Sequence, residues 1–90
     1  MSLQTTMILT DLLCYLRQRL VDAMSQRDPA RISDLQQTLV LLQEAAWEVQ
    51  DERRAALIQD MIDAARDALV GVEWKTNLPS VEAIRAAETG

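Results

Sequence analysis

Three aspartates give this chain its closest approach to a catalytic or metal-binding constellation. Asp60, Asp63 and Asp67 follow i, i+3, i+7 spacing, which places them on one face of a helix. Carboxylates on such a face can bridge metal ions, but sites of that kind usually add histidines and ligands from a second helix. The chain has no histidine, and Arg66 offsets part of the charge. We therefore interpret the three aspartates as the solvated side of an amphipathic helix, and we predict no metal site.

The remaining residue types do not point to catalysis either. Without histidine, the chain lacks the usual general base and the usual partner of a nucleophilic serine or cysteine. Cys14 is the only cysteine and lies inside the apolar run 12–16, which is typical of a small buried side chain. Only two glycines are present, so no phosphate-cradling loop can be built. We expect no catalytic residue, no cofactor and no small-molecule substrate, and we predict that the protein is not an enzyme.

The charge distribution narrows the classes of partner. The formal net charge is −5, with residues 1–43 summing to zero and residues 44–90 carrying ten acids against five bases. No basic patch is available to neutralise phosphates, so we expect neither direct nucleic-acid binding nor binding to an anionic membrane. The longest apolar run is far shorter than the ~20 residues of a membrane span. A single cysteine and a poor signal-peptide pattern favour a cytoplasmic protein.

Apolar periodicity predicts the first helix at about residues 6–25. Apolar residues make up 49% of the chain, and Phe is absent, which is typical of an all-α protein. Ile8 and Tyr15 lie to one side of the main apolar stripe, so this helix is apolar on more than one face. We expect it to be central, either inside a bundle or at a subunit interface. The main stripe has 4-3-4-3 spacing and consists of Leu9, Leu13, Leu16, Leu20 and Ala23.

The next segment reads as one long helix, at about residues 29–70. Asp28 and Pro29 form an N-cap and first helical position, and Gly71 is a C-terminal stop. No Gly, Pro or Asn lies between Ala30 and Val70. The apolar stripe nevertheless rotates by ~120° near residues 50–53. We favour a continuous, kinked helix because turn residues are absent there. The alternative is a break near residues 50–53, with Asp51 capping a third helix.

The C-terminal part is predicted as a loop followed by a short helix. Residues 72–78 form the loop, with Trp74 and Leu78 as apolar anchors, and the helix covers about residues 80–88. The whole chain, 1–90, is thus one all-α domain. We predict a helical hairpin or small three-helix bundle with a long second helix. Since the rest of the chain is too short to cover such a helix, we expect a dimer or a partner-bound protein.

The candidate partner interface follows from the apolar stripes that lack a predicted neighbour. Burying each large apolar side chain contributes about 1.5–3 kcal/mol, and a tryptophan beside the main stripe often anchors an interface. We therefore predict a non-catalytic helical protein–protein interaction module, which binds a protein partner, a second copy of itself or both. The candidate interface residues are Ile8, Tyr15, Trp47, Ile58, Met61, Ile62, Leu69 and Trp74.

A short segment resembles a known class of bacterial chaperone. The segment 27–35, about a tenth of the chain, resembles the hairpin turn and second helix of flagellar export chaperones. Its residues are Arg27-Asp28-Pro29-Ala30-Arg31-Ile32-Ser33-Asp34-Leu35. The resemblance implies a small acidic cytosolic chaperone or adaptor that holds an aggregation-prone helix of its client. Two alternatives remain open. One is an acidic inhibitor that mimics nucleic acid, and the other is a structural subunit of a phage particle or a large enzyme complex.

Overall fold

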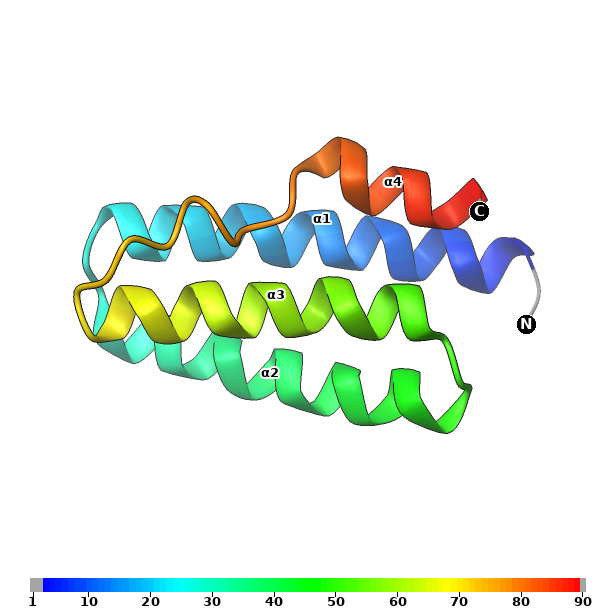
Figure 1. Cartoon of the computed structure of the whole chain (residues 1–90), viewed down its shortest axis with the longest axis horizontal. Helices are drawn as coiled ribbons and strands as arrows, with labels where there is room; N and C mark the ends of the chain where they lie inside the picture. The colour runs from blue at the N-terminus through cyan, green and yellow to red at the C-terminus, as the bar shows by residue number, and fades with distance from the viewer. Residues whose placement is uncertain (1–2, 90) are drawn as a thin grey trace.

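The described part of the chain is entirely helical. The computed structural model describes the backbone of residues 3–89 and the side chains of residues 8–87. Four helices are present in it: α1 (Leu3–Ser25), α2 (Pro29–Glu48), α3 (Glu52–Leu69) and α4 (Val81–Thr89). Figure 1 shows α1, α2 and α3 side by side with alternating direction, and α4 lying on α1. The predicted all-α fold is confirmed, and the bundle measures 38 × 23 × 17 Å.

Helix α1 is the central element of the bundle, as its apolar faces predict. It packs against α2, α3 and α4, whereas α2 and α3 form the most extensive helix pair. Its fully buried residues Leu13 and Leu20 lie in the middle of the core, together with Leu39 of α2 and Ile58 of α3. Among residues 3–89, no helix combines the length and the apolar character needed to cross a membrane.

The preference for one continuous second helix was wrong. Helix α2 ends at Glu48 and α3 begins at Glu52, so the chain reverses at residues 49–51. Gln50 adopts φ 57°, and Asp51 caps α3 by accepting a hydrogen bond from the Arg54 backbone N–H. The alternative of a break with Asp51 as N-cap is the arrangement that the structure has.

A single type of helix ending recurs at three points of the chain. Each has one residue in the left-handed conformation: Arg27 (φ 54°), Gln50 (φ 57°) and Gly71 (φ 80°). In each case, that residue's N–H bonds the carbonyl three residues back, and the next N–H bonds the carbonyl five residues back. This is the Schellman pattern, which satisfies the free carbonyls of a helix end. Only one of the three positions is a glycine, so the absence of glycine near residue 50 did not exclude a turn.

The reversal explains the rotation of the apolar stripe. Because α3 runs back along α2, the apolar stripe after the reversal, which includes Ile58 and Ile62, faces inward. It joins the core that the stripe before the reversal, which includes Leu39, forms with α1. Ile58 and Met61 are 0% exposed and Ile62 is 3% exposed. Burying side chains of this size contributes about 1.5–3 kcal/mol each, against a cost of about 1–2 kcal/mol for a left-handed residue such as Gln50. Packing therefore outweighs the local cost of the turn.

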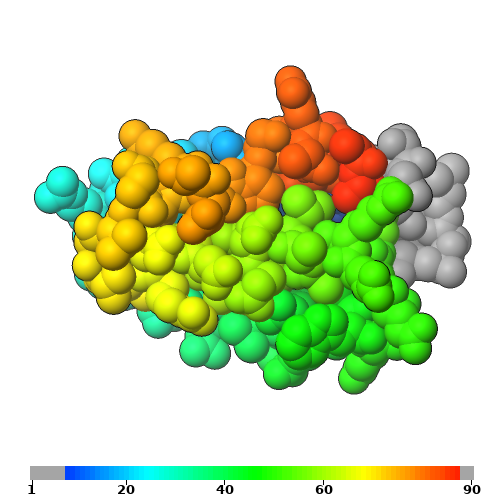
Figure 2. All heavy atoms as spheres, in the orientation of Figure 1, coloured from blue at the N-terminus to red at the C-terminus, as the bar shows by residue number. Residues whose placement is uncertain are grey.

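The C-terminal segment consists of a loop and a short helix, as predicted, and it packs along the bundle. Trp74 and Leu78 are half-buried against the core, and the Arg17 side chain of α1 donates a hydrogen bond to the Pro79 carbonyl at 2.7 Å. Ser80 accepts a hydrogen bond from the Ala83 N–H and so caps α4. Ile84 is 1% exposed and fixes α4 on α1 and α3. This leaves one face of α3 open between α2 and α4 (Figure 2).

Candidate protein interface beside the α2–α3 turn

The predicted interface residues separate into four places in the structure. Three of them, Ile58, Met61 and Ile62, lie in the chain's own core. Their assignment to a partner-facing surface is corrected, because the reversal at residues 49–51 gives the second apolar stripe a neighbour within the chain. The apolar side of α3, which we expected to lack a neighbour within a continuous helix, thus packs against α2, α1 and α4.

Two candidates lie on the outer side of α1. Ile8 is 62% exposed and Tyr15 is 59% exposed, and the guanidinium of Arg19 lies 5.9 Å from the centre of the Tyr15 ring. Leu12 joins them at i+4 from Ile8, because it is 38% exposed rather than part of the core stripe. Cys14 is half-buried with a free thiol.

Two further candidates meet at the end of the bundle that holds the α1–α2 turn. Leu69 of α3 and Trp74 of the following loop both line an open groove of about 440 Å³. Trp74 is half-buried against the core, and the Lys75 ammonium lies 5.8 Å from the centre of its ring. The Trp74 indole is therefore largely covered by contacts within the chain. Arg27 also lines this groove and gives the groove a cationic edge.

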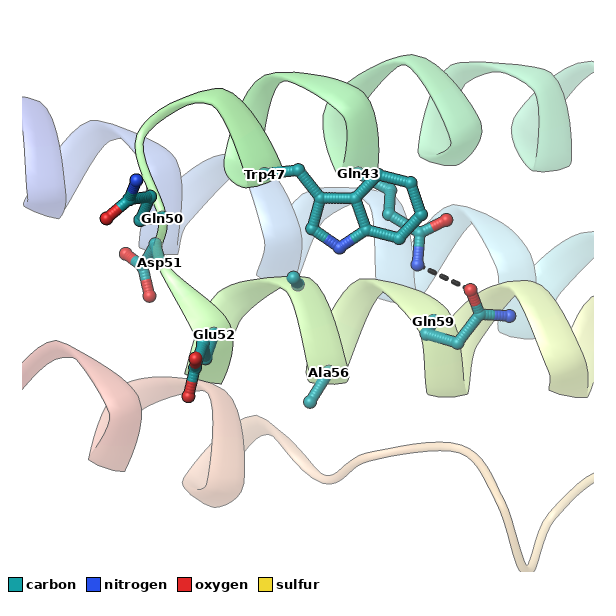
Figure 3. A pocket seen from close by; sticks show the side chains of 8 residues that line it. Gln43, Trp47, Gln50, Asp51, Glu52, Ala56 and Gln59 are labelled. Carbon is teal, nitrogen blue, oxygen red and sulfur yellow. Dashed lines mark hydrogen bonds between the residues drawn. The ribbon is translucent and has the colours of Figure 1, made fainter.

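The remaining candidate, Trp47, lies at the opposite end of the bundle. Its side chain is 62% exposed, although it is among the largest apolar groups in the chain. Figure 3 shows the indole lying across the space between α2 and α3. It borders an open groove of about 620 Å³, which we call the Trp47 groove. The groove is lined by Gln43, Trp47, Gln50, Asp51, Glu52, Ala55, Ala56 and Gln59.

Local structure explains why the indole is held in this position. Trp47 lies on the last turn of α2, and its carbonyl accepts the Gln50 N–H of the Schellman ending. The turn joins α2 to α3 at that point, and the only apolar residues of α3 that line the groove are the small residues Ala55 and Ala56. Because alanine leaves space that a larger side chain would fill, the indole has no large apolar neighbour on α3 and remains open to a partner.

Side-chain hydrogen bonds connect α2 and α3 at the inner end of the groove. Gln43 is buried, and its side-chain amide donates to the Gln59 carbonyl oxygen (Figure 3), while Gln59 in turn donates to Asp63 at 2.9 Å. Near the turn, Asp51 forms a largely buried ion pair with Arg54. The groove is thus bounded by satisfied polar groups, so it is preformed.

The groove carries negative charge. Two carboxylates, Asp51 and Glu52, are among the lining residues, and no lining residue is cationic. Glu44 is exposed one turn before Trp47 on α2. Arg54 is buried and already paired with Asp51, and Arg53 lines the neighbouring groove between α3 and α4. The exposed rim near Trp47 is therefore acidic, as the excess of acids in residues 44–90 leads one to expect.

The aspartate face of α3 does not assemble a metal site. In the described part of the chain, no group of three or more cysteine, aspartate or glutamate side chains has the geometry to hold a metal ion. Asp63 accepts from Gln59 and Asp67 accepts from Asn77 at 3.2 Å. Burial raises the pKa of the Asp60 carboxyl, and the charge of Asp63 raises it further.

Sequence reasoning missed several residues that shape the surface. Leu41 of α2 is 66% exposed, and Ala55 and Ala56 provide the apolar side of the Trp47 groove. A sequence signal for the turn beside this groove was nevertheless present, since the pattern Asp-x-x-Arg occurs at both Asp28–Arg31 and Asp51–Arg54.

In comparisons with known proteins, the chain matches no protein-family model, no curated protein and no solved structure.

Proposed function

We propose that this protein is a non-catalytic helical protein–protein interaction module of the chaperone or adaptor type. The observation that carries the proposal is Trp47, whose side chain is 62% exposed at the edge of a preformed groove. Tryptophan is enriched among the residues that dominate binding energy, because it offers a large rigid apolar surface together with an N–H donor. A groove between two helices is also a common site for a helix of another protein.

The chemistry-bearing residues support the absence of a catalytic role. The chain has no histidine to act as general base, and its single thiol, Cys14, is half-buried in α1. A single cysteine fits a reducing compartment, and we propose the cytoplasm as the location. The segment 27–35, which resembles the flagellar export chaperones, forms a helical hairpin turn here and so supports the chaperone assignment.

The nucleic-acid mimic is the less favoured alternative. A mimic would need rows of unpaired carboxylates, but several aspartates lie within 4.0 Å of an arginine nitrogen. These pairs include Asp28–Arg31, Asp63–Arg66 and Asp11–Arg85. A structural subunit of a larger assembly would bind through the same exposed side chains as an adaptor does. Affinity isolation would identify the bound protein in either case.

The test is affinity isolation from native-host extract with matched baits. We expect a protein that is retained by the wild-type chain, identified by mass spectrometry, and lost when Trp47 is replaced by alanine. Leu41→Ala is the control, because Leu41 is also exposed on α2 but points ~120° away from Trp47. The proposal is wrong if no protein is retained above the level seen with an unrelated bait. It is also wrong if the retention of every protein is unchanged by both substitutions and by buffer salt.

A further inference from the structure

We propose that the Trp47 groove binds a cationic amphipathic helix of another protein. This inference rests on the interaction function proposed above and adds the chemical class of the partner. Its basis is the combination of an exposed indole, a helix-lined groove of about 620 Å³, the acidic lining residue Glu52 and the exposed Glu44 close by.

The shape of the groove favours a helix over an extended segment. Its lining comes from the antiparallel helices α2 and α3 and from the turn between them, so a helix of another protein can lie along them. The described residues form no strand, so this part of the chain offers no sheet edge to pair with an extended peptide. A partner helix can instead place its ridge of side chains between α2 and α3, as helices do in a bundle. Ala55 and Ala56 permit the close approach that this packing requires.

The apolar part of the site specifies one anchor of the partner helix. The Trp47 indole provides a large flat surface, and Ala55 and Ala56 form the facing wall. A Leu, Ile or Met side chain fits such a space and would bury the indole that is now exposed. The indole N–H, which makes no hydrogen bond within the described part of the chain, gains a polar partner on the incoming helix.

The charges around the groove specify the flanking residues of the partner. Glu52 of α3 lines the groove, and the exposed Glu44 lies one turn before Trp47 on α2, so each helix carries an acid near the indole. The charge of Asp51 is balanced by its ion pair with Arg54. A lysine or arginine next to the apolar anchor can pair with Glu52 or Glu44, and an arginine can also stack on the indole face. An acidic helix would be repelled at the same positions. A second copy of this chain is disfavoured for that reason, because residues 44–90 would bring five net negative charges against themselves.

The test presents the full chain with a display library of random helical peptides, which assumes nothing about the natural partner. We expect the enriched peptides to carry net positive charge and apolar residues at i, i+3 or i+4 and i+7. Their affinity should fall at least ~30-fold in Trp47→Ala, which corresponds to the ~2 kcal/mol that defines a binding hot spot. Affinity should also fall steeply between 50 mM and 500 mM salt, and that slope should flatten in the Glu44→Gln, Glu52→Gln double variant.

Controls separate this inference from the proposed function. Leu41→Ala should bind the selected peptides like the wild type, and far-UV circular dichroism checks that each variant keeps its helix content. Neutral or acidic selected peptides, or peptides that bind Trp47→Ala unchanged, would overturn the groove assignment and leave the interaction function standing. A library that yields no binder at all would count against both. A homodimer that dissociates on Trp47→Ala would also overturn the proposed occupant, and analytical ultracentrifugation measures this directly.

Discussion

The two hairpin turns provide a matched pair of capping aspartates that differ in burial. Asp28 caps α2 and Asp51 caps α3, and each accepts a hydrogen bond from the backbone N–H three residues later, at 3.3 and 3.2 Å. Each also forms an ion pair with the arginine at that position, Arg31 or Arg54. The side chains of the first pair are 63% and 37% exposed, whereas those of the second are 10% and 16% exposed.

We expect Asp51→Ala to destabilise the protein much more than Asp28→Ala. Loss of an N-cap costs about 1 kcal/mol at either site. Loss of the exposed pair with Arg31 adds no more than about 1 kcal/mol, because water and salt screen it. Removing Asp51 leaves the Arg54 guanidinium buried without a counter-charge, which typically costs about 3–5 kcal/mol. Since Arg54 can move partly towards water, we expect a total of about 3–4 kcal/mol for Asp51→Ala and about 1–1.5 kcal/mol for Asp28→Ala.

Urea unfolding followed by far-UV circular dichroism measures both changes. The midpoint should shift while the slope with denaturant stays constant, so that the difference reports stability rather than compactness. The double variant Asp51→Ala, Arg54→Met should recover much of the loss, because it removes the unpaired charge as well. Asp51→Asn keeps a capping oxygen and isolates the effect of the charge. If Asp51→Ala and Asp28→Ala differ by less than ~0.5 kcal/mol, burial does not control the strength of this pair and the reasoning fails.

Three further predictions concern the core, the turn and the acidic face. Ile58→Ala should lower stability by about 2–5 kcal/mol, whereas Leu41→Ala should stay within about 0.5 kcal/mol; equal losses in urea unfolding would show that Ile58 is not in the core. Gln50→Gly should raise the free energy of unfolding by up to about 1 kcal/mol, because glycine adopts φ 57° without the Cβ conflict; a decrease would mean that residue 50 is not left-handed. Burial and then Asp63 raise the pKa of Asp60 in the folded state, so its charge opposes folding at neutral pH and this effect is lost as pH falls through that pKa. Asp60→Asn should therefore raise the thermal midpoint at pH 7 but not at pH 3, and a gain of equal size at both values would contradict the assignment.

Much of the local structure could be predicted because its signals are short-range. Asp28 and Pro29 start α2, and Gly71 ends the helical region at the predicted place. The short C-terminal helix also follows from neighbouring residues, since it was predicted at about residues 80–88 and α4 covers Val81–Thr89. These features depend on capping bonds and backbone conformations that involve only a few consecutive residues.

The break between α2 and α3 could not be decided by the same local rules. Turn statistics favour glycine at a left-handed position, and Gln50 does not match them. The ~120° rotation of the apolar stripe was the relevant signal, but it was compatible with a continuous helix that had two partners. The choice depends on the burial of Ile58, Met61 and Ile62 in a core that α3 shares with α2 and α1, so it involves residues far apart in the chain. Sequence periodicity alone cannot weigh that long-range gain.

The candidate site illustrates the same division between sequence and tertiary structure. The sequence by itself determined that the chain is all-helical, that its second half is acidic and that it has no histidine, because these follow from residue types and helical spacing. Only the tertiary structure decided which apolar side chains are covered. On one continuous helix, Trp47 and Ile58 would lie on nearly the same face, because they are eleven positions apart. In the structure, however, Ile58 is 0% exposed and Trp47 is 62% exposed. Helical spacing fixes which residues share a face, whereas exposure depends on which other helix packs against that face.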